Sequence, residues 1–348
     1  MRRLAALLTA LLCTLALTSA PASAASTPQV VSRGHVQPWG IAFLPDGSAL
    51  FTERGTRRIW AVTPGRPARV IYTVTEAAQR GEGGLLGIAV GPDYLRDRRV
   101  YLYYTTTRDN RIAYVVRGSA ARPRPVLTGI PAASSHNGGR ITFGPDRMLY
   151  AGTGDAQVRD ASQDPRSLGG KVLRMTKEGA PAPGNPFGTV VLSRGHRNVQ
   201  GLAFVGNHLM ATEFGQDRFD EVNHIVPGGN YGWPLVEGRS SDPRFRNPVH
   251  QWTPDQASPS GMTFHDGSLY VAALRGQRLW RLQLDGLRVT RASSLYQGTY
   301  GRLRAASVNP KDRSMWLLTG NGTDDRVLRI ATFPEPPAAR RPPHGRGR

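Results

Sequence analysis

Gly40–Val62 reads GIAFLPDGSALFTERGTRRIWAV, and this pattern decides the fold because it recurs along the chain. Each unit combines a short alternating strand, a turn of the Pro-Asp-Gly kind, a second apolar strand and often a third. The five further units begin at Gly87, Gly139, Gly201, Gly261 and Ala305. They recur at roughly 45–60 residues, the spacing of four-stranded propeller blades. The sequence therefore predicts an all-β, six-bladed β-propeller, and no stretch has the helical periodicity of an α/β fold.

Composition agrees with a single large β domain. The chain has 348 residues, of which 39% are hydrophobic, with 40 Gly and 27 Pro. Glycine and proline at this density, between short apolar runs, are typical of many strands joined by tight turns. We expect the propeller to occupy residues 25–332 and a short disordered tail, rich in Pro and Arg, to occupy residues 333–348.

The first 24 residues have the features of a signal peptide. MRRLAALLTALLCTLALTSAPASA carries two arginines, an apolar stretch and a final Ala-Ser-Ala. The apolar stretch is short for a membrane span, so we expect cleavage, no remaining span, and a secreted or cell-envelope protein. The only cysteine, Cys13, leaves with this segment, and the mature chain then has neither a disulfide nor a thiolate.

The net charge is +20, from 45 basic and 25 acidic residues, and nearly all the basic residues are arginine. Arginine favours planar, bidentate recognition of carboxylate or phosphate. No helix-turn-helix, zinc or RNA-binding signature accompanies the charge, and an exported chain rarely meets nucleic acid. The composition therefore favours an anionic small ligand and no nucleic-acid partner.

Loops that precede the innermost strands of a propeller meet at the mouth of its central channel. His136 lies in such a loop, within SSHNGGRITFGPD, next to small residues and glycines. Arg197 and Asn198 hold the matching place before the strand at Gly201, and Glu82 holds it before the strand at Gly87. A lone histidine is more often structural than catalytic. By contrast, Arg140 lies closer to its strand, where it could simply pair in the core.

Two further groups of residues point to ligand chemistry. The stretch EFGQDRFDEVNHIVPGGNYGWP supplies Gly215, Gln216, Glu221 and Tyr231, and carbonyl and carboxylate oxygens with a glycine bend suit Ca²⁺. The spacing is not that of an EF-hand. Arg302 and Arg304 are spaced to lie on one side of an extended segment, and Arg275 precedes another strand. Such arginines can clamp carboxylates, although a solvated strand face is the commoner explanation.

The motifs PWGIAFLPDG, GEGGLLGIAVGPD, SSHNGGRITFGPD, GHRNVQGLAF and DEVNHIVPGGNYGWP occur in this order. Together they resemble the soluble sugar dehydrogenases that depend on pyrroloquinoline quinone (PQQ), the family of soluble glucose dehydrogenase and aldose sugar dehydrogenase. The resemblance runs from about Val36 to Ile330. It implies an enzyme that oxidises the anomeric carbon of aldoses to lactones and passes the electrons to an unidentified acceptor.

The resemblance also implies roles for single residues. His136 would be the general base while hydride passes to the quinone, Asp155 would orient it, and Arg197 would stabilise charge on the quinone. Asn198, Arg275, Arg302 and Arg304 fall on cofactor-binding positions. Glu82 and Ser135 fall on substrate-binding positions. The carbonyls of Gly215 and Gln216 would bind Ca²⁺, with Glu221 and Tyr231 near the ion.

Three departures from the family pattern bear on these roles. Arg275 stands where the glucose enzymes have lysine, Gln216 where they have proline, and Ser135 where they have aspartate. Arginine in place of lysine at position 275 keeps the positive charge but not the hydrogen-bond geometry. Since Ser135 and Glu82 both alter the substrate side, we expect a broader range of aldoses.

Two other functions remain open on the sequence alone. One is a Ca²⁺-dependent propeller lactonase, which needs carboxylate and Asn ligands converging on the metal, whereas this channel mouth offers chiefly arginines. The other is a non-catalytic propeller that binds a protein or a glycan on its face. The sequence is compatible with a monomer or a homodimer.

Overall fold

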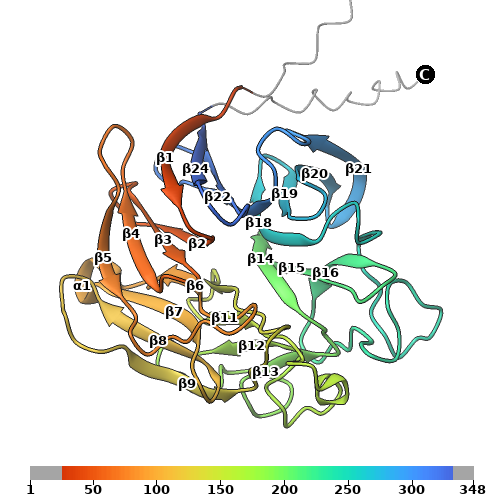
Figure 1. Ribbon diagram of the computed structural model, residues 1–348. Helices are drawn as coiled ribbons and strands as arrows, with labels where there is room; N and C mark the ends of the chain where they lie inside the picture. The colour runs from red at the N-terminus through yellow and green to blue at the C-terminus, as the bar shows by residue number, and fades with distance from the viewer. Residues whose placement is uncertain (1–25, 332–348) are drawn as a thin grey trace, which may run out of the picture.

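The structure is a computed structural model that describes residues 26–331, and these residues form six four-stranded antiparallel sheets. The sheets surround a common axis (Figure 1), which confirms the six-bladed β-propeller. The predicted signal peptide, residues 1–24, and the predicted tail, residues 333–348, lie outside the described residues. Within the described range, no helix has both the length and the apolar character needed to cross a membrane.

Four consecutive strands make up each of the first five blades, from the axis outward. The first three blades contain β2 (Pro38–Phe43), β3 (Ala49–Glu53), β4 (Arg58–Val62) and β5 (Arg69–Thr73); β6 (Leu85–Val90), β7 (Arg99–Thr105), β8 (Asn110–Val116) and β9 (Arg124–Ile130); and β10 (Ile141–Phe143), β11 (Leu149–Gly152), β12 (Lys171–Met175) and β13 (Val191–Arg194). The next two contain β14 (Val199–Val205), β15 (His208–Glu213), β16 (Asp220–Ile225) and β17 (His250–Trp252); and β18 (Pro259–His265), β19 (Ser268–Ala273), β20 (Arg278–Asp285) and β21 (Arg288–Leu295).

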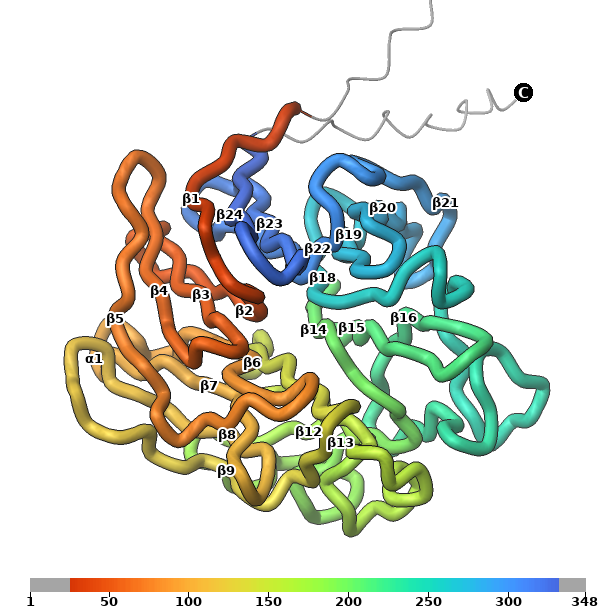
Figure 2. Tube along the Cα trace, in the orientation of Figure 1, coloured from red at the N-terminus to blue at the C-terminus, as the bar shows by residue number. Residues whose placement is uncertain are grey.

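The sixth blade joins the two ends of the propeller. It contains β22 (Leu303–Val308), β23 (Met315–Thr319), β24 (Asp325–Ile330) and, as its outermost strand, β1 (Gln29–His35). Gln29 pairs with Arg329 in antiparallel register, and Figure 2 shows β1 (red) beside β24 (blue). The repeat pattern in the sequence begins at Gly40, so it did not predict the strand β1. Hydrogen bonds between the chain's ends therefore close the ring.

The Pro-Asp-Gly turns form as the sequence predicts in the first unit but not in the second. Asp46 Oδ1 accepts hydrogen bonds from the backbone N–H and the hydroxyl of Ser48, and Gly47 has a φ of 85°. In the second unit Tyr replaces the glycine after Asp93. The chain there forms a single helical turn, α1 (Tyr94–Asp97), in place of a tight turn.

The glycine that recurs in the innermost strands is required by close packing at the axis. A Cβ on Gly87 would lie 2.2 Å from the carbonyl oxygen of Gly139 in the next blade. A Cβ on Gly201 would lie 2.4 Å from the carbonyl oxygen of Ser260. Neighbouring inner strands therefore approach so closely that a side chain at these positions would force them apart.

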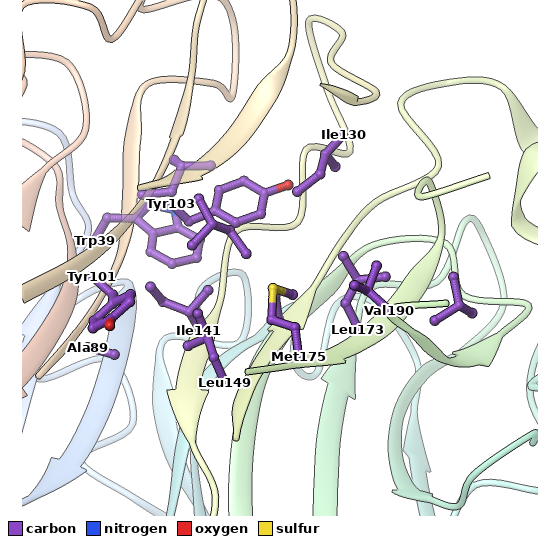
Figure 3. Packing of buried hydrophobic residues seen from close by; sticks show 14 residues of the cluster. Trp39, Ala89, Tyr101, Tyr103, Ile130, Ile141, Leu149, Leu173, Met175 and Val190 are labelled. Atoms are coloured by element: carbon purple, nitrogen blue, oxygen red, sulfur yellow. The ribbon is translucent and has the colours of Figure 1, made fainter. Parts of the chain in front are cut away.

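The apolar core lies between blades, and it also supports the channel mouth. One buried cluster contains Trp39 from β2, Tyr103 from β7 and Ile141 from β10 (Figure 3). The hydroxyl of Tyr103 donates a 2.8 Å hydrogen bond to the carbonyl oxygen of Asn137, one residue after His136. A fully buried core residue therefore holds the loop that carries the candidate base.

Candidate active site

His136 is held at the mouth of the channel by two neighbouring loops, one with Glu82 and one with residues 154–156. Its backbone φ is 58°, and its N–H donates a 2.9 Å hydrogen bond to the carboxylate of Glu82. Its carbonyl accepts a hydrogen bond from the N–H of Ala156. A Cβ on Gly154 would lie 1.8 Å from that same carbonyl, so only glycine allows the loops to meet there. The small residues around His136 thus make room for neighbouring backbone.

Asp155 orients the His136 ring. Its Oδ1 lies 2.8 Å from Nδ1 of His136, and its Oδ2 accepts a 2.8 Å hydrogen bond from the indole nitrogen of Trp233. Burial by itself would raise the pKa of the Asp155 carboxyl, but the hydrogen bonds from His136, Gln157 N–H and Trp233 hold that pKa below its usual value. The ionised carboxylate favours a proton on Nδ1. Nε2 of His136 has no partner among the described residues, so it can accept a proton.

Arg197 lies beside this pair. Its Nε and Nη2 both donate to the side-chain oxygen of Gln216, at 3.0 and 2.7 Å. Its guanidinium stands 5.5 Å from the ring centre of Trp233. Burial lowers the pKa of Arg197, although the nearby carboxylates oppose that shift. Trp233 therefore touches both Asp155 and Arg197 and joins the candidate base to the candidate charge-stabilising group.

A repeated four-residue motif, for which no role was predicted from the sequence, positions Arg197. The letters SRGH occur at residues 32–35 and again at 193–196. In the second copy Ser193 bonds His196, His196 bonds the carboxylate of Glu213, and Glu213 accepts the backbone N–H of Arg197. All three side chains are buried, so this Ser-His-Glu arrangement has no access to substrate and acts as a clasp.

The first SRGH copy builds the same clasp in the opposite half of the ring. Ser32 bonds His35 at 2.7 Å, and His35 approaches the carboxylate of Glu53 at 3.3 Å. Glu53 accepts the backbone N–H of Val36, which occupies the place that Arg197 holds in the second copy. The two clasps have the same chemistry, but only the second one supports a candidate site residue.

Two adjoining cavities next to this cluster are lined by unpaired arginines. Their volumes are about 130 and 240 Å³, and they share Trp39, Arg54, Arg302 and Arg304. In the described part of the chain, none of these three arginines forms an ion pair within 4 Å. Among the described residues, Arg54 and Arg304 donate only to neutral groups, and the Arg302 side chain has no hydrogen bond. Within residues 26–331, Glu82 is the one acidic residue that lines either cavity.

The concentration of positive charge is visible at Arg304. Burial, followed by the charges of Arg54, Arg140 and Arg302, lowers the pKa of Arg304 to about 9. Like charges held together in this way are costly without counter-charges. Arg302 and Arg304 line the same two cavities, which agrees with the prediction that their spacing places both on one side of the segment. An anionic ligand with several carboxylates would offset this repulsion.

The other predicted positions lie around these cavities. Asn198 accepts the N–H of Gly138 and the side-chain amide of Gln200, both at 3.0 Å. Gly138 and Gln200 line the smaller cavity, whereas His136 and Arg197 stand beside it. Ser135 accepts a 2.9 Å hydrogen bond from Gln157 at the outer edge of the mouth. Arg275 is exposed and directly follows Leu274, a lining residue.

The four predicted metal-site residues do not converge. The carbonyl oxygens of Gly215 and Gln216 accept no hydrogen bond from any described residue. Glu221 is buried and accepts from Gly238 N–H and from Asn223. The hydroxyl of Tyr231 bonds backbone groups at the far end of β16 from the 215–216 loop. Residues 26–331 hold no group of three or more His, Cys, Asp or Glu suited to a metal.

Four residues at the site were not identified as site residues from the sequence: Trp39, Arg54, Gln200 and Trp233. Three of them lie inside the motifs quoted above, PWGIAF, HRNVQGL and GGNYGWP. A tryptophan in a glycine-rich loop was an available signal, since such a side chain must pack against something. Arg54 had no signal of its own. Arg140 is buried as expected, but no carboxylate of residues 26–331 pairs with it.

Comparison with known proteins places these observations in a family. The family model described as glucose/sorbosone dehydrogenase matches residues 35–329. The PQQ-bound aldose sugar dehydrogenase of Streptomyces coelicolor is 46% identical, with a TM-score of 0.85 over 89% of this chain and 99% of that one. Aldose sugar dehydrogenase YliI of Escherichia coli is 28% identical over 84% of this chain and 90% of its own length. Quinoprotein glucose dehydrogenase B of Acinetobacter calcoaceticus is 32% identical over 61% of this chain and 52% of its own.

Proposed function

The chain belongs to the glucose/sorbosone dehydrogenase family, and on that basis we propose that it is a PQQ-dependent aldose sugar dehydrogenase. It would oxidise the anomeric carbon of aldoses to lactones and pass the electrons to an external acceptor. The observation that carries this proposal is the meeting of an oriented histidine with a cavity of arginines that lack counter-charges.

The residues present fit the quinone. PQQ carries three carboxylates, and Arg54, Arg302 and Arg304 supply guanidinium groups that no described carboxylate pairs with. The side-chain nitrogen of Asn198 likewise has no partner in the described residues. Arg275 would add a further positive charge at the rim next to Leu274. When bound, the quinone would supply the two-electron acceptor for the anomeric C–H bond.

The chain's own residues supply the acid–base and electrostatic parts. His136 would take the proton of the anomeric hydroxyl at Nε2, while Asp155 keeps the other ring nitrogen protonated. Arg197 would stabilise negative charge next to the base. Glu82 and Ser135 would contact the sugar from the outer side of His136. Trp233 and the loops around Gly154 would keep the histidine from moving as the proton transfers.

Only two of the four predicted metal-site residues fit a role as Ca²⁺ ligands. The carbonyl oxygens of Gly215 and Gln216, which accept no hydrogen bond from a described residue, are ligands of the kind that Ca²⁺ prefers and would hold the ion. Glu221 and Tyr231 use their polar atoms elsewhere and would act as neighbours of the metal loop at most. Protein stripped with a chelator should therefore bind the quinone poorly, and Ca²⁺ should restore binding. Unchanged quinone binding in the stripped protein would argue against the metal.

Export completes the proposal. The charged start, apolar stretch and Ala-Ser-Ala end of residues 1–24 support a secreted or cell-envelope location. Mass spectrometry of protein recovered outside the cell should find an N-terminus at or near Ala25.

The decisive experiment is reconstitution. Purified protein with PQQ and Ca²⁺ should reduce an artificial dye when aldoses are added. His136→Ala should lower turnover by about 10²–10⁴-fold if it removes the base. His208→Ala is the matched control, since His208 is exposed and bonds only His224. Lactone hydrolysis without quinone would favour a lactonase. Failure to bind quinone in the presence of Ca²⁺ would favour a non-catalytic binder.

A further inference from the structure

The central channel contains a second cavity at the opposite end from the candidate active site. Its volume is about 480 Å³, and the ends of the innermost strands line it, among them Phe43, Phe143 and Val308. The two arginine-lined cavities, here called the upper cavities, are instead lined by residues at the beginnings of those strands. Trp39 and Gln200 lie between the two levels, because each contacts Arg140 below and Arg304 above. The 480 Å³ cavity, here called the lower cavity, is therefore separate from the upper cavities.

Arg140 is the one charged side chain that lines this cavity in the described part of the chain. It is only 9% exposed, and its Nε donates a 2.9 Å hydrogen bond to the carbonyl oxygen of Gln200. Neither of its Nη atoms has a hydrogen-bond partner among the described residues, and Nη2 is fully buried. Its guanidinium lies 4.3 Å from the ring centre of Trp39, which supplies attraction but no acceptor.

An unpaired guanidinium in a buried position needs an acceptor. Burying a charge without a counter-charge or hydrogen bonds is strongly unfavourable. Burial lowers the pKa of Arg140 to about 9, so the side chain stays cationic at neutral pH. No acidic residue lines the cavity, and the acceptor must therefore come from outside the described chain.

The remaining walls define the rest of the ligand. They are mostly aliphatic and aromatic, with Ile41, Ile88, Leu202 and Met262 among them. Two hydroxyl-bearing residues, Thr142 and Ser307, also line the cavity. The aliphatic and aromatic side chains among the lining residues favour a ligand with an apolar body, which gains from burial. The volume falls within the range of about 300–1,000 Å³ that small-molecule sites occupy.

We propose that this lower channel cavity binds a monocarboxylate with an apolar body, such as an aromatic or short aliphatic acid. Its carboxylate pairs with the guanidinium of Arg140 through Nη1, and its body lies against the apolar strand ends. The site is independent of the proposed dehydrogenase activity, because it shares no lining residue with the arginine cavities above.

The test is a calorimetric titration of the quinone-free protein with benzoate. We expect saturable binding that requires Arg140, with a Kd in the range of about 0.1–1 mM. Benzyl alcohol lacks the charge and acetate lacks the body, so each should bind at least about tenfold more weakly. Arg140→Gln removes the partner, and Thr142→Glu places a competing carboxylate on the wall. Both should weaken benzoate binding by about tenfold or more, while Arg302→Gln should leave it unchanged.

Three results would overturn the proposal. The first is the absence of saturable heat with benzoate in protein that unfolds normally. The second is binding that Arg302→Gln abolishes and Thr142→Glu preserves, which would assign benzoate to the upper arginines. The third is acetate binding as tightly as benzoate, which would reduce the cavity to a simple anion site. Thr142→Glu keeps the test valid if Arg140→Gln does not fold.

Discussion

The Nδ1 atom of His136 and the Oδ1 atom of Asp155 lie 2.8 Å apart, and Asp155 is fully buried. The indole of Trp233 holds the second carboxylate oxygen, so neither side chain can turn without breaking a hydrogen bond. This arrangement leaves Nε2 of His136 as the only ring nitrogen able to accept a proton. The catalytic role that we propose for His136 therefore depends on Asp155.

Asp155→Asn should reduce turnover by about 10²–10⁴-fold while changing the affinity for quinone little, because an amide no longer fixes the ring tautomer. The measurement is steady-state dye reduction over a range of pH. Asp164→Asn is the matched control, since Asp164 is exposed and pairs only with Arg166. An Asp155→Asn enzyme with the pH profile and turnover of the parent would show that the pairing does not orient the base.

The two SRGH clasps provide an internal comparison. His196→Asn and His35→Asn each break a Ser-His-Glu arrangement whose His and Glu are buried, and each should cost about 1–3 kcal/mol in the free energy of unfolding. Only His196→Asn should also lower kcat, by about tenfold or more, because only that clasp fixes the backbone of Arg197. Denaturant unfolding and turnover at saturating quinone measure the two effects. Equal losses of kcat would mean that the clasps act through stability alone.

Arg302→Gln and Arg304→Gln should each weaken quinone binding by about 10–100-fold, because a charged hydrogen-bond donor to carboxylate is lost. Titration of the metal-loaded protein, followed by the absorption of the quinone, measures the affinity. Arg288→Gln is the control, since Arg288 is exposed on β21 and pairs with Asp285. Arg275→Gln belongs in the same series, and an effect as large as that of Arg302→Gln would assign Arg275 to the cofactor.

Glu221 predicts a pH dependence of stability. Burial, followed by repulsion from Glu213, raises the pKa of its carboxyl well above the usual value of 4.5. The folded protein therefore binds a proton that the unfolded chain releases, and the stability contributed by this group falls as pH rises above about 4.5 through the folded pKa. Glu221→Gln should be as stable as the parent at pH 5 and more stable at pH 8.5, by about 1–3 kcal/mol.

Glutamine is accommodated at this position after one rearrangement. Asn223 Oδ1 is buried without a partner among the described residues, and it can accept from a glutamine amide if the Asn223 amide turns over. Denaturant unfolding of the metal-free protein at both pH values measures the effect, with the exposed Glu178→Gln as control. A destabilised Glu221→Gln at pH 8.5 would contradict a protonated Glu221.

The sequence was sufficient for the blades but not for the ring closure. Each blade depends on residues adjacent in the chain, whose alternation and turn chemistry appear directly in the letters, as in Gly40–Val62. The α1 turn at Tyr94 shows that the prediction is limited even within a blade. The absence of one glycine there replaces the expected tight turn with a helical turn. The pairing of β1 with β24 joins residues about 300 positions apart, and no local pattern announces it.

The candidate site also has one part that the sequence predicts and one part that depends on the tertiary structure. The sequence by itself determined the residue types at the channel mouth: a histidine among glycines, paired arginines, and a glycine loop with free carbonyls. Only the tertiary structure decided which of them share a cavity and that Tyr231 points away from the metal loop. It also decided that Trp233 links Asp155 with Arg197, and that Arg140 has no counter-charge among the described residues. The physical reason is that local sequence sets backbone conformation, whereas contacts between blades depend on how close-packed side chains from distant segments fill the space around one axis.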